Sequence, residues 1–247
     1  MSCEGITFLS SVPMRAQPTE KSEMVSQLLF GERFEIIDQT EKWLDVRSKI
    51  DGYQGWVSKN MVDLNSKITF SEVECSAFSV WTVNGVQRIL PGGCFLPDNA
   101  ALGTFEINCE QYNFYSRTNT FAEKSIANFA KQYLGAPYLW GGKTILGIDC
   151  SALVQIACRM AGFWIARDAW QQQTAGQAIT PEDAETDNLA FFCDDNGKII
   201  HTGIICNKNS IIHASGLVRV DKFDKNGIFN VAENKYTHKL HSIRGIH

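Results

Sequence analysis

The segment Gly147-Ile-Asp-Cys-Ser-Ala-Leu-Val-Gln-Ile-Ala-Cys-Arg-Met-Ala-Gly162 encodes a helix with a clear start and end. Asp149 is a favourable N-cap residue, and Gly162 suits the position just past a helix C-terminus. Between them lies an apolar stripe at helical spacing, made of Leu153, Ile156, Ala157 and Met160. The pattern predicts an amphipathic helix whose first turn contains Cys150.

Cys150 is the candidate nucleophile. The free backbone N–H groups and the dipole of a helix N-terminus favour an anion, so we expect a depressed pKa for this thiol. The alternative is a buried structural cysteine, because a free cysteine packs as a small apolar residue. We take Cys158, further along the same helix, as structural.

A thiolate nucleophile needs a base, and two histidines lie in apolar, strand-like runs downstream. His201 lies within residues 199–205 and His213 within residues 211–215, and residues 206–210 resemble a hairpin connection. If the loop has an odd number of residues, both side chains point to one face of the sheet. One imidazole could then be the base and the other could orient it. An even loop without a bulge would place them on opposite faces. The alternative is two core histidines with satisfied hydrogen bonds.

The surrounding residues predict an α+β domain. Thr120-Phe-Ala-Glu123 fits a capping box, and a helical stripe follows that ends near Gly135 and Pro137. Strand-like runs come after the two helices, at residues 189–193, 198–206, 210–215 and 217–220. Helices followed by an antiparallel sheet are typical of the α+β class.

The first 118 residues have a different sequence pattern. Short runs rich in aromatic and β-branched residues alternate with turns, at residues 28–37, 43–47, 53–57, 78–83, 88–90 and 104–107. Asn84-Gly85 predicts a hairpin turn. We therefore predict two small β-barrels, at residues 1–64 and 65–118, before an α+β domain at residues 119–247.

Composition excludes several classes of protein. The 247 residues carry a net charge of −4, and the sequence has no basic cluster, so we expect no nucleic-acid partner. No apolar run is long enough for a transmembrane helix, and the N-terminus lacks the features of a signal peptide. We expect a cytoplasmic monomer that does not bind membranes, unless a leader is missing from this sequence.

Cysteine and histidine spacing predicts no metal or cofactor. The eight cysteines contain no C-x-x-C pair and no zinc-finger spacing, so we expect reduced thiols. His238, His241 and His247 lack a convincing third ligand, and we take them as solvated histidines near the C-terminus. Trp164 and Trp170 could line a groove or could be ordinary core or surface residues.

Four motifs in fixed order resemble the NlpC/p60 cysteine peptidases, which have papain-like folds and cut cell-wall peptides. They are Ala136-Pro-Tyr-Leu-Trp-Gly-Gly142, Gly147-Ile-Asp-Cys-Ser151, His201-Thr-Gly203 and Ile212-His-Ala-Ser215. The resemblance covers about residues 119–220. It implies that Cys150 is the nucleophile, His201 the general base and His213 the orienting residue. It also implies that Tyr138 assists the oxyanion site and that Trp140 contributes to substrate binding.

Three positions depart from the family pattern. Ala152 replaces the usual glycine after Asp-Cys-Ser, Thr202 replaces valine in His-Val-Gly, and Asp187-Asn-Leu189 replaces Gly-Asp-Leu. None of these changes removes a catalytic atom. They bear on substrate detail more than on activity.

The N-terminal region resembles the first bacterial SH3-type barrel of YkfC-like γ-D-glutamyl-L-diamino-acid endopeptidases. Residues 22–27 and 51–57 carry this resemblance. It implies that Glu23 and Tyr53 reach the active site, where Asp149 and Ser151 complete a pocket for a free N-terminal ammonium. The alternatives are a solvated carboxylate at Glu23 and an ordinary barrel-surface aromatic at Tyr53.

The resemblance implies hydrolysis of the γ-D-glutamyl-L-diamino-acid bond, with lysine or meso-diaminopimelate as the diamino acid. The substrates would be murein peptides with a free N-terminal L-alanine, in cell-wall peptide recycling. Two alternatives stay open. One is an amidase or acyltransferase that uses the same cysteine and histidines, and the other is a wall-peptide-binding protein without catalysis.

Overall fold

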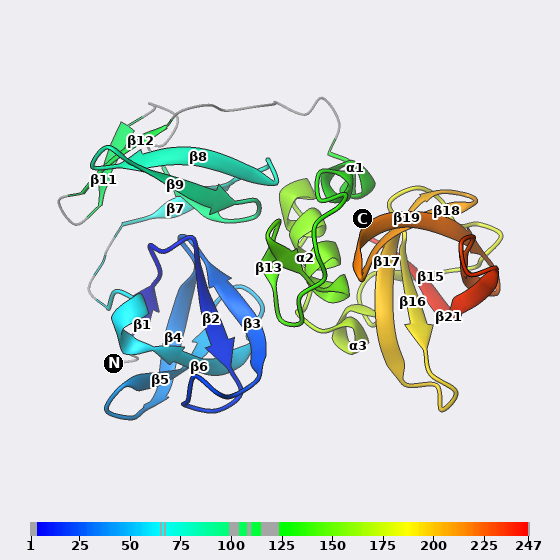
Figure 1. The fold of residues 1–247 in the computed structure, drawn as a ribbon, viewed down its shortest axis with the longest axis horizontal. Coiled ribbons are helices and arrows are strands. Elements are labelled where there is room, and N and C mark those ends of the chain that lie inside the picture. Colours follow the sequence, from blue (N-terminus) through cyan, green and yellow to red (C-terminus); the bar gives the residue numbers. More distant parts are fainter. Residues whose placement is uncertain are drawn as a thin grey trace. The chain divides into compact units, whose positions relative to one another are not determined.

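The computed structural model describes residues 4–64, 66, 68–98, 104–107, 110–114 and 124–246. The chain forms two compact units (Figure 1). The N-terminal unit contains residues 1–122 and 140–145, and the C-terminal unit contains residues 123–139 and 146–247. The predicted boundaries at residues 64 and 118 stay a prediction. In the described ranges, no helix has both the length and the apolar character needed to cross a bilayer.

The N-terminal unit begins with a six-stranded antiparallel sheet in the order β1-β4-β5-β6-β2-β3. Its inward side chains form an apolar core that includes Met14, Phe34 and Val46. Gly31, at φ +77°, separates the predicted strand of residues 28–37 into two. The elements are β1 (Glu4–Ile6), β2 (Ser11–Arg15), β3 (Met24–Leu29), β4 (Arg33–Gln39), β5 (Trp43–Ser48), β6 (Gln54–Ser58) and the short 3-10 helix η1 (Lys59–Met61).

A second group of strands follows in the same unit. A four-stranded sheet has the order β11-β12-β8-β9, and β7 pairs with β10. The predicted hairpin turn is confirmed, since Asn84 and Gly85 have φ of +50° and +80° between β8 and β9. The strands are β7 (Phe70–Val73), β8 (Phe78–Val83), β9 (Val86–Pro91), β10 (Phe95–Pro97), β11 (Thr104–Ile107) and β12 (Glu110–Phe114).

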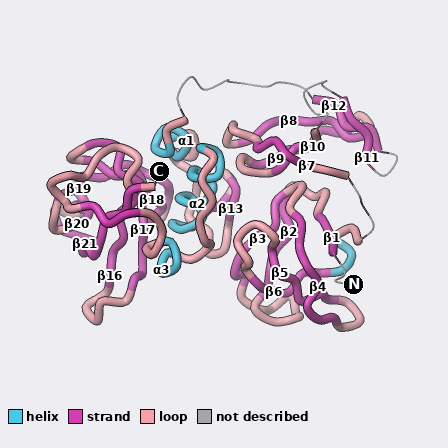
Figure 2. Tube along the Cα trace, turned by 180° about the vertical axis from the view of Figure 1, so that it is seen from behind, coloured by secondary structure: helices cyan, strands magenta, loops and turns pink. Residues whose placement is uncertain are grey.

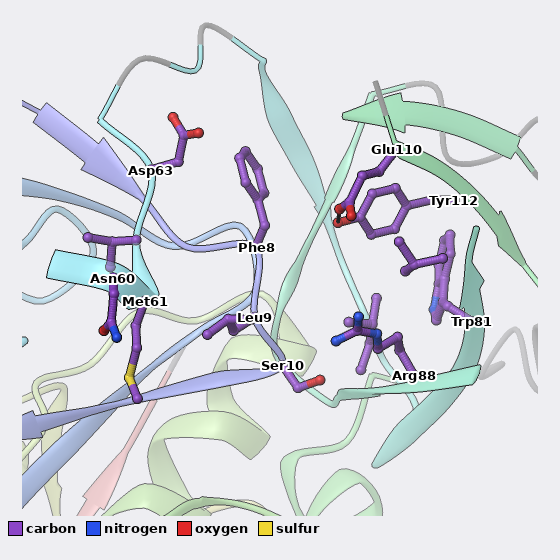
Figure 3. A pocket seen from close by; sticks show the side chains of 13 residues that line it. Phe8, Leu9, Ser10, Asn60, Met61, Asp63, Trp81, Arg88, Glu110 and Tyr112 are labelled. Atoms are coloured by element: carbon purple, nitrogen blue, oxygen red, sulfur yellow. Dashed lines mark hydrogen bonds between the residues drawn. The ribbon is translucent and has the colours of Figure 1, made fainter. Parts of the chain in front are cut away.

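A cavity of about 280 Å³ lies in this unit between the two groups of strands (Figure 3). Its walls include Phe8 and Met61 on one side and Trp81 and Tyr112 on the other. The exposed Arg88 also lines it. The cavity is therefore lined by both apolar and charged side chains, and the charged ones include Glu110 and Asp63.

Residues 140–145 are anchored to β3 and the turn after it. The ammonium of Lys143, which begins β13 (Lys143–Thr144), lies 3.2 Å from the Glu32 carboxylate, and both side chains are buried. The Lys143 backbone N–H donates to the Gln27 side chain at 2.7 Å. A Cβ atom on Gly141 would lie 2.3 Å from the Met24 carbonyl oxygen, so only glycine fits at this close approach.

The described part of the C-terminal unit contains the helices α1 (Ile126–Lys131), α2 (Cys150–Ala161) and α3 (Ala169–Gln172). The predicted helix α2 is confirmed at both ends. The Asp149 side chain accepts the Ala152 N–H at 2.8 Å, and Gly162 has φ +96°. Helix α1 is shorter than the predicted stripe, and its N-cap is Ser125. The predicted capping box at residues 120–123 lies outside the described residues.

The sheet of this unit has the order β15-β21-β16-β17-β18-β19-β20, and β21 also pairs with β20. That extra pairing closes the sheet on itself (Figure 2). One face encloses a core that includes Phe192, Ile205 and Ile228, and α1 and α2 pack against β17 and β18. The strands are β14 (Gly147–Ile148), β15 (Gln177–Ile179), β16 (Leu189–Cys193), β17 (Ile199–Asn207), β18 (Ser210–Ser215), β19 (Leu217–Asp224), β20 (Gly227–Asn230) and β21 (Lys235–Gly245).

The predicted α+β arrangement of this region is observed. The predicted bounds of β16 and β18 are confirmed, and β17 and β19 begin within one residue of their predicted starts. Strands β20 and β21 were not predicted. Strand β21 is rich in polar residues, so hydrophobic alternation gave little signal for it.

Candidate active site

Cys150 begins helix α2, as predicted, but its environment is not the one expected. The side chain is only 7% exposed. Burial, and then the Asp149 carboxylate, raise the pKa of the Cys150 thiol to about 12, although backbone N–H groups of Thr202 and Ser151 and the Arg167 charge oppose the shift. The predicted depressed pKa is therefore wrong for this state. Desolvation disfavours a thiolate more strongly than the helix N-terminus favours it.

A buried ion pair anchors the start of α2. The Arg167 guanidinium donates to both oxygens of the Asp149 carboxylate, at 3.1 and 2.6 Å. It also donates to the Ser151 hydroxyl at 2.9 Å, and that hydroxyl lies 3.1 Å from Asp149. Asp149 and Ser151, predicted to bind substrate, are thus joined in one network with Arg167. The charge of Asp149 is already balanced within the chain.

His201 and His213 point to the same face of the sheet, and a β-bulge is the reason. The turn between β17 and β18 has only two residues, Lys208 and Asn209, which is an even number. Without a bulge, His213 would pair with Ile204 and point away from His201. The register shifts between Ile205 and Asn207, because the bulge adds one residue to β17. This extra residue returns His201 and His213 to the same face of the sheet. Nε2 of His201 and Nδ1 of His213 are 2.9 Å apart.

Gly203 makes room for this pair of rings. A Cβ atom built on Gly203 would lie 3.0 Å from the Cβ atom of His213 and 2.9 Å from the Ile212 carbonyl oxygen. Both contacts are closer than side chains tolerate. The glycine of the His-Thr-Gly motif therefore has a local physical role, which is to let His213 lie across from it.

A chain of hydrogen bonds extends from His201 into strand β19. Nε2 of His213 lies 3.0 Å from the Asp221 carboxylate, and the Arg219 guanidinium donates to the same oxygen at 2.8 Å. Burial acts to raise the pKa of Asp221, but hydrogen bonds from His213 and Arg219 outweigh it and the pKa is lowered. Asp221 is therefore an ionised acceptor.

This chain determines which ring nitrogens carry protons. A carboxylate can only accept, so Nε2 of His213 carries a hydrogen. With both rings neutral, Nδ1 of His213 accepts from Nε2–H of His201, and Nδ1 of His201 then holds a lone pair. Burial, His238 and His213 lower the pKa of His201 well below its ordinary value, which keeps that ring neutral. Thr202, the residue after His201, places its backbone N–H at the Cys150 sulfur.

His238 does not behave as a solvated histidine near the chain end, so that prediction is wrong. It lies in β21, and its ring stacks on the ring of His201 with centroids 4.1 Å apart and planes 27° apart. His241, by contrast, is exposed, and its ring contacts the Ser242 hydroxyl. Within the described ranges, no three or more Cys, His, Asp or Glu side chains form a group that could hold a metal ion.

Tyr138 lies near Cys150. Burial, then Cys150 and Asp149, raise the pKa of Tyr138 to about 12, although Arg167 opposes the shift. Its backbone N–H donates to the Gly216 carbonyl at 2.9 Å. The phenol therefore keeps its proton at neutral pH and can donate a hydrogen bond, as an oxyanion donor must.

The remaining predicted residues belong to the N-terminal unit. The indole N–H of Trp140 donates to the Glu23 carboxylate at 2.6 Å, and Trp140 is 60% exposed. Tyr53 is half-buried and packs against the core of the first sheet. Trp140 and Glu23 are thus brought together. The prediction that Glu23 and Tyr53 reach Cys150 stays a prediction.

The sequence analysis missed three residues of this region: Arg167, Asp221 and His238. Arg167 comes directly before the helix-capping Asp168, and a lone arginine gives no pattern signal. Asp221 is eight positions after His213, so it pairs with that ring only because β18 and β19 form a hairpin. The signal that could have found Asp221 is its even spacing from Arg219 and Phe223, but the predicted strand ended at residue 220, whereas β19 extends to Asp224.

The structure describes six of the eight cysteines, and Cys150, Cys158, Cys193 and Cys206 among them are free thiols. This agrees with the expected reduced thiols. Cys3 and Cys109 lie outside the described residues. Cys158 is fully buried in α2, which agrees with its structural assignment.

Comparison with known proteins supports the fold. Residues 135–242 match the NlpC/P60 family, and residues 14–61 match the bacterial dipeptidyl-peptidase SH3 domain. A relative from Bacillus subtilis (strain 168), named Gamma-D-glutamyl-L-lysine dipeptidyl-peptidase, is 25% identical over 76% of this chain and 71% of its own length. Dipeptidyl-peptidase 6 of Lysinibacillus sphaericus is 27% identical over 85% of this chain and 87% of its own length.

A solved structure shows the same fold. It is the crystal structure of an NlpC/P60 family protein from Bacillus cereus ATCC 10987, which matches 98% of this chain and 99% of its own chain. The TM-score is 0.77 at 17% sequence identity. The predicted fold class, a papain-like α+β domain after an SH3-like region, is confirmed.

Proposed function

Residues 135–242 are a peptidase domain of the NlpC/P60 family, and from this we propose that the protein hydrolyses the γ-D-glutamyl-L-diamino-acid bond of murein peptides with a free N-terminal L-alanine. The observation that carries the proposal is the hydrogen-bonded chain from His201 through His213 to Asp221. It orients the neutral imidazole of His201, and the next residue, Thr202, donates its backbone N–H to the Cys150 sulfur. No step of the proposed reaction requires a cofactor.

The reaction begins with a neutral thiol and a neutral imidazole. Both the raised pKa of Cys150 and the lowered pKa of His201 disfavour a resting ion pair. The proton therefore moves from Sγ to Nδ1 of His201 as the sulfur attacks the carbonyl carbon of the scissile amide. The imidazolium so formed is stabilised through His213 by the charge of Asp221.

The tetrahedral intermediate then collapses to a thioester. Its oxyanion takes hydrogen bonds from the backbone N–H of Cys150 and from the Tyr138 hydroxyl, which stays protonated because its pKa is raised to about 12. His201 returns the proton to the leaving amine of the diamino acid. A water molecule, deprotonated by the same ring, then hydrolyses the thioester and frees Cys150.

The substrate class rests on the relatives' names and on the expected partners of a free ammonium. A desolvated ammonium needs a carboxylate, and Asp149 already has its charge balanced by Arg167. The proposal therefore gives the main role at the L-alanine end to Glu23, with Tyr53, Trp140 and Ser151 as further polar or aromatic neighbours. Such a requirement restricts the enzyme to released peptides, which suits peptide recycling.

The test compares two peptides that differ in one group. L-Ala-γ-D-Glu-diaminopimelate and its N-acetylated form are incubated with the protein, and the products are followed by mass spectrometry; the lysine peptides are tested in parallel. We expect cleavage of the free-amine peptide alone. The Cys150→Ala variant abolishes cleavage, whereas the matched Cys158→Ala variant, altered in the same helix, retains it.

Other outcomes separate the alternatives. Equal cleavage of both peptides keeps the peptidase and contradicts the role of Glu23 in ammonium binding. Transfer of the acyl group to an added amine instead of water identifies an acyltransferase. No cleavage of any of these peptides by the folded protein, together with binding of the free-amine peptide, supports a binding protein without catalysis.

A further inference from the structure

His238 lies against the catalytic base although it is far from it in sequence. Its ring is nearly parallel to the ring of His201, with 4.1 Å between centroids. The same ring meets His213 edge-on at 5.7 Å and Phe192 at 6.0 Å. His201 is thus covered on one face by His238 and contacted at its Nε2 atom by His213.

The closure of the sheet delivers His238 to this place. Strand β21 pairs with β16 on one side and with β20 on the other, and His238 lies opposite Ile228 of β20. The Thr237 hydroxyl lies 2.9 Å from Nδ1 of His238, which fixes the rotation of that ring. His238 is half-buried, so it stands between His201 and the surroundings.

The charges around His238 keep it neutral at neutral pH. Burial, then the neighbouring His213 and Arg219, lower the pKa of His238 to about 4, and the Asp221 carboxylate opposes the shift. Thr237 and Phe192 add no charge. A neutral ring can stack on His201 both in its neutral state and in the imidazolium state formed during the reaction.

We infer that His238 is a positioning residue of the proposed peptidase: it holds the ring plane of His201 and shields that ring from water. This inference rests on the proposed function. The hydrogen bond to His213 holds only the Nε2 atom of the His201 ring. The plane of the ring can therefore still turn about an axis through that atom. The stack with His238 removes this freedom and so keeps Nδ1 aimed for proton transfer. Misplacement of a catalytic group by about 1 Å can cost roughly 100-fold in rate.

The test uses two substitutions at one position and one matched control. His238→Ala removes the stack, His238→Phe keeps a flat ring that cannot titrate, and His241→Ala changes the exposed histidine of the same strand. For His238→Ala we expect kcat to fall by about 10- to 100-fold with KM changed by less than about threefold. His238→Phe and His241→Ala keep kcat within about threefold of the parent.

The pH dependence of kcat/KM separates positioning of His201 from a purely structural role, because loss of a structural contact alone would not shift the pKa of His201. The base works when neutral, so activity falls as pH drops through the pKa of His201. In His238→Ala water reaches the ring, the pKa rises toward its ordinary value of about 6.5, and the acid limb of kcat/KM moves to higher pH. Nitrogen-15 spectra of the imidazoles follow the same titration without any substrate.

Each outcome decides the inference. Unchanged kcat and an unchanged acid limb in His238→Ala would overturn it, as would equal damage from Ala and Phe in folded protein. If His238→Ala does not fold, His238→Leu replaces it as the non-planar variant with the same expected loss. If the parent cleaves no murein peptide, the proposed function fails, but the imidazole titration still tests the stack.

Discussion

The ion pair between Arg167 and Asp149 is expected to be a main source of stability at the start of α2. The two side chains are 2% and 7% exposed, and Arg167 donates to both carboxylate oxygens. Arg167→Met keeps the apolar stem and removes the guanidinium. The Asp149 carboxylate then stays buried without its counter-charge.

Removing one partner of a buried ion pair lowers the free energy of unfolding by about 3–5 kcal/mol. For a chain of this size, each 1 kcal/mol lowers Tm by about 2–4 °C, so we expect a fall of roughly 6–20 °C. Asp149→Asn alone should also destabilise, because it removes the negative charge that the Arg167 guanidinium faces. The double variant should lose less than the sum of the two single losses, with a coupling of about 1–3 kcal/mol.

Thermal and urea unfolding followed by circular dichroism measure these differences, with amide exchange in α2 to localise them. Lys222→Met, at an exposed position of the same unit, is the control and should stay within about 0.5 kcal/mol of the parent. A second readout is alkylation of Cys150. Since Arg167 lowers the pKa of that thiol, its loss should slow alkylation at a given pH.

Two results would refute this reasoning. One is a loss below about 1 kcal/mol in Arg167→Met, which would mean that water or other groups replace the guanidinium. The other is strict additivity in the double variant, which would mean that the two side chains do not interact energetically.

Substitutions at three further positions have expected outcomes. Asp221→Ala should lower kcat by about 100-fold, whereas Asp221→Asn should lose less, because its amide oxygen can still accept from His213 although the stabilising charge is gone; peptide hydrolysis measures both, and equal losses would contradict the acceptor role. Gly203→Ala should lower the free energy of unfolding by about 1–3 kcal/mol and remove most of the activity, because its Cβ atom would lie 2.9 Å from the Ile212 carbonyl oxygen. Tm and kcat measure these effects, and a variant that behaves like the parent would show that β18 can shift freely. Lys143→Met should destabilise the N-terminal unit by about 3–5 kcal/mol, seen as lost amide protection in β3, and unchanged protection would argue against the buried pair.

Local signals predicted a substantial part of the fold. The N-cap at Asp149, the terminating Gly162 and the Asn84-Gly85 turn each depend on backbone geometry within a few residues. The structure reproduces all three. Such features are predictable because the physical cause, a cap or a positive φ, lies in the residues themselves.

The sequence could not decide whether the rings of His201 and His213 point to the same face of the sheet. Their spacing showed only that the answer depends on whether the hairpin loop has an odd or an even number of residues and on whether a bulge is present. The outcome depended on a bulge in β17, which pattern alone does not reveal. His238 gave still less warning, because its contact with His201 exists only after β21 has closed the sheet.

The amino-acid sequence by itself determined the chemical groups, their order along the chain and the helix that begins at Cys150. Only the tertiary structure decided their protonation and their partners. Burial makes Cys150 a thiol instead of a thiolate and keeps His201 neutral, because desolvation depends on what packs around a group. In the same way, Asp221 contacts His213 and His238 contacts His201 through strand pairing, and no local pattern encodes such contacts.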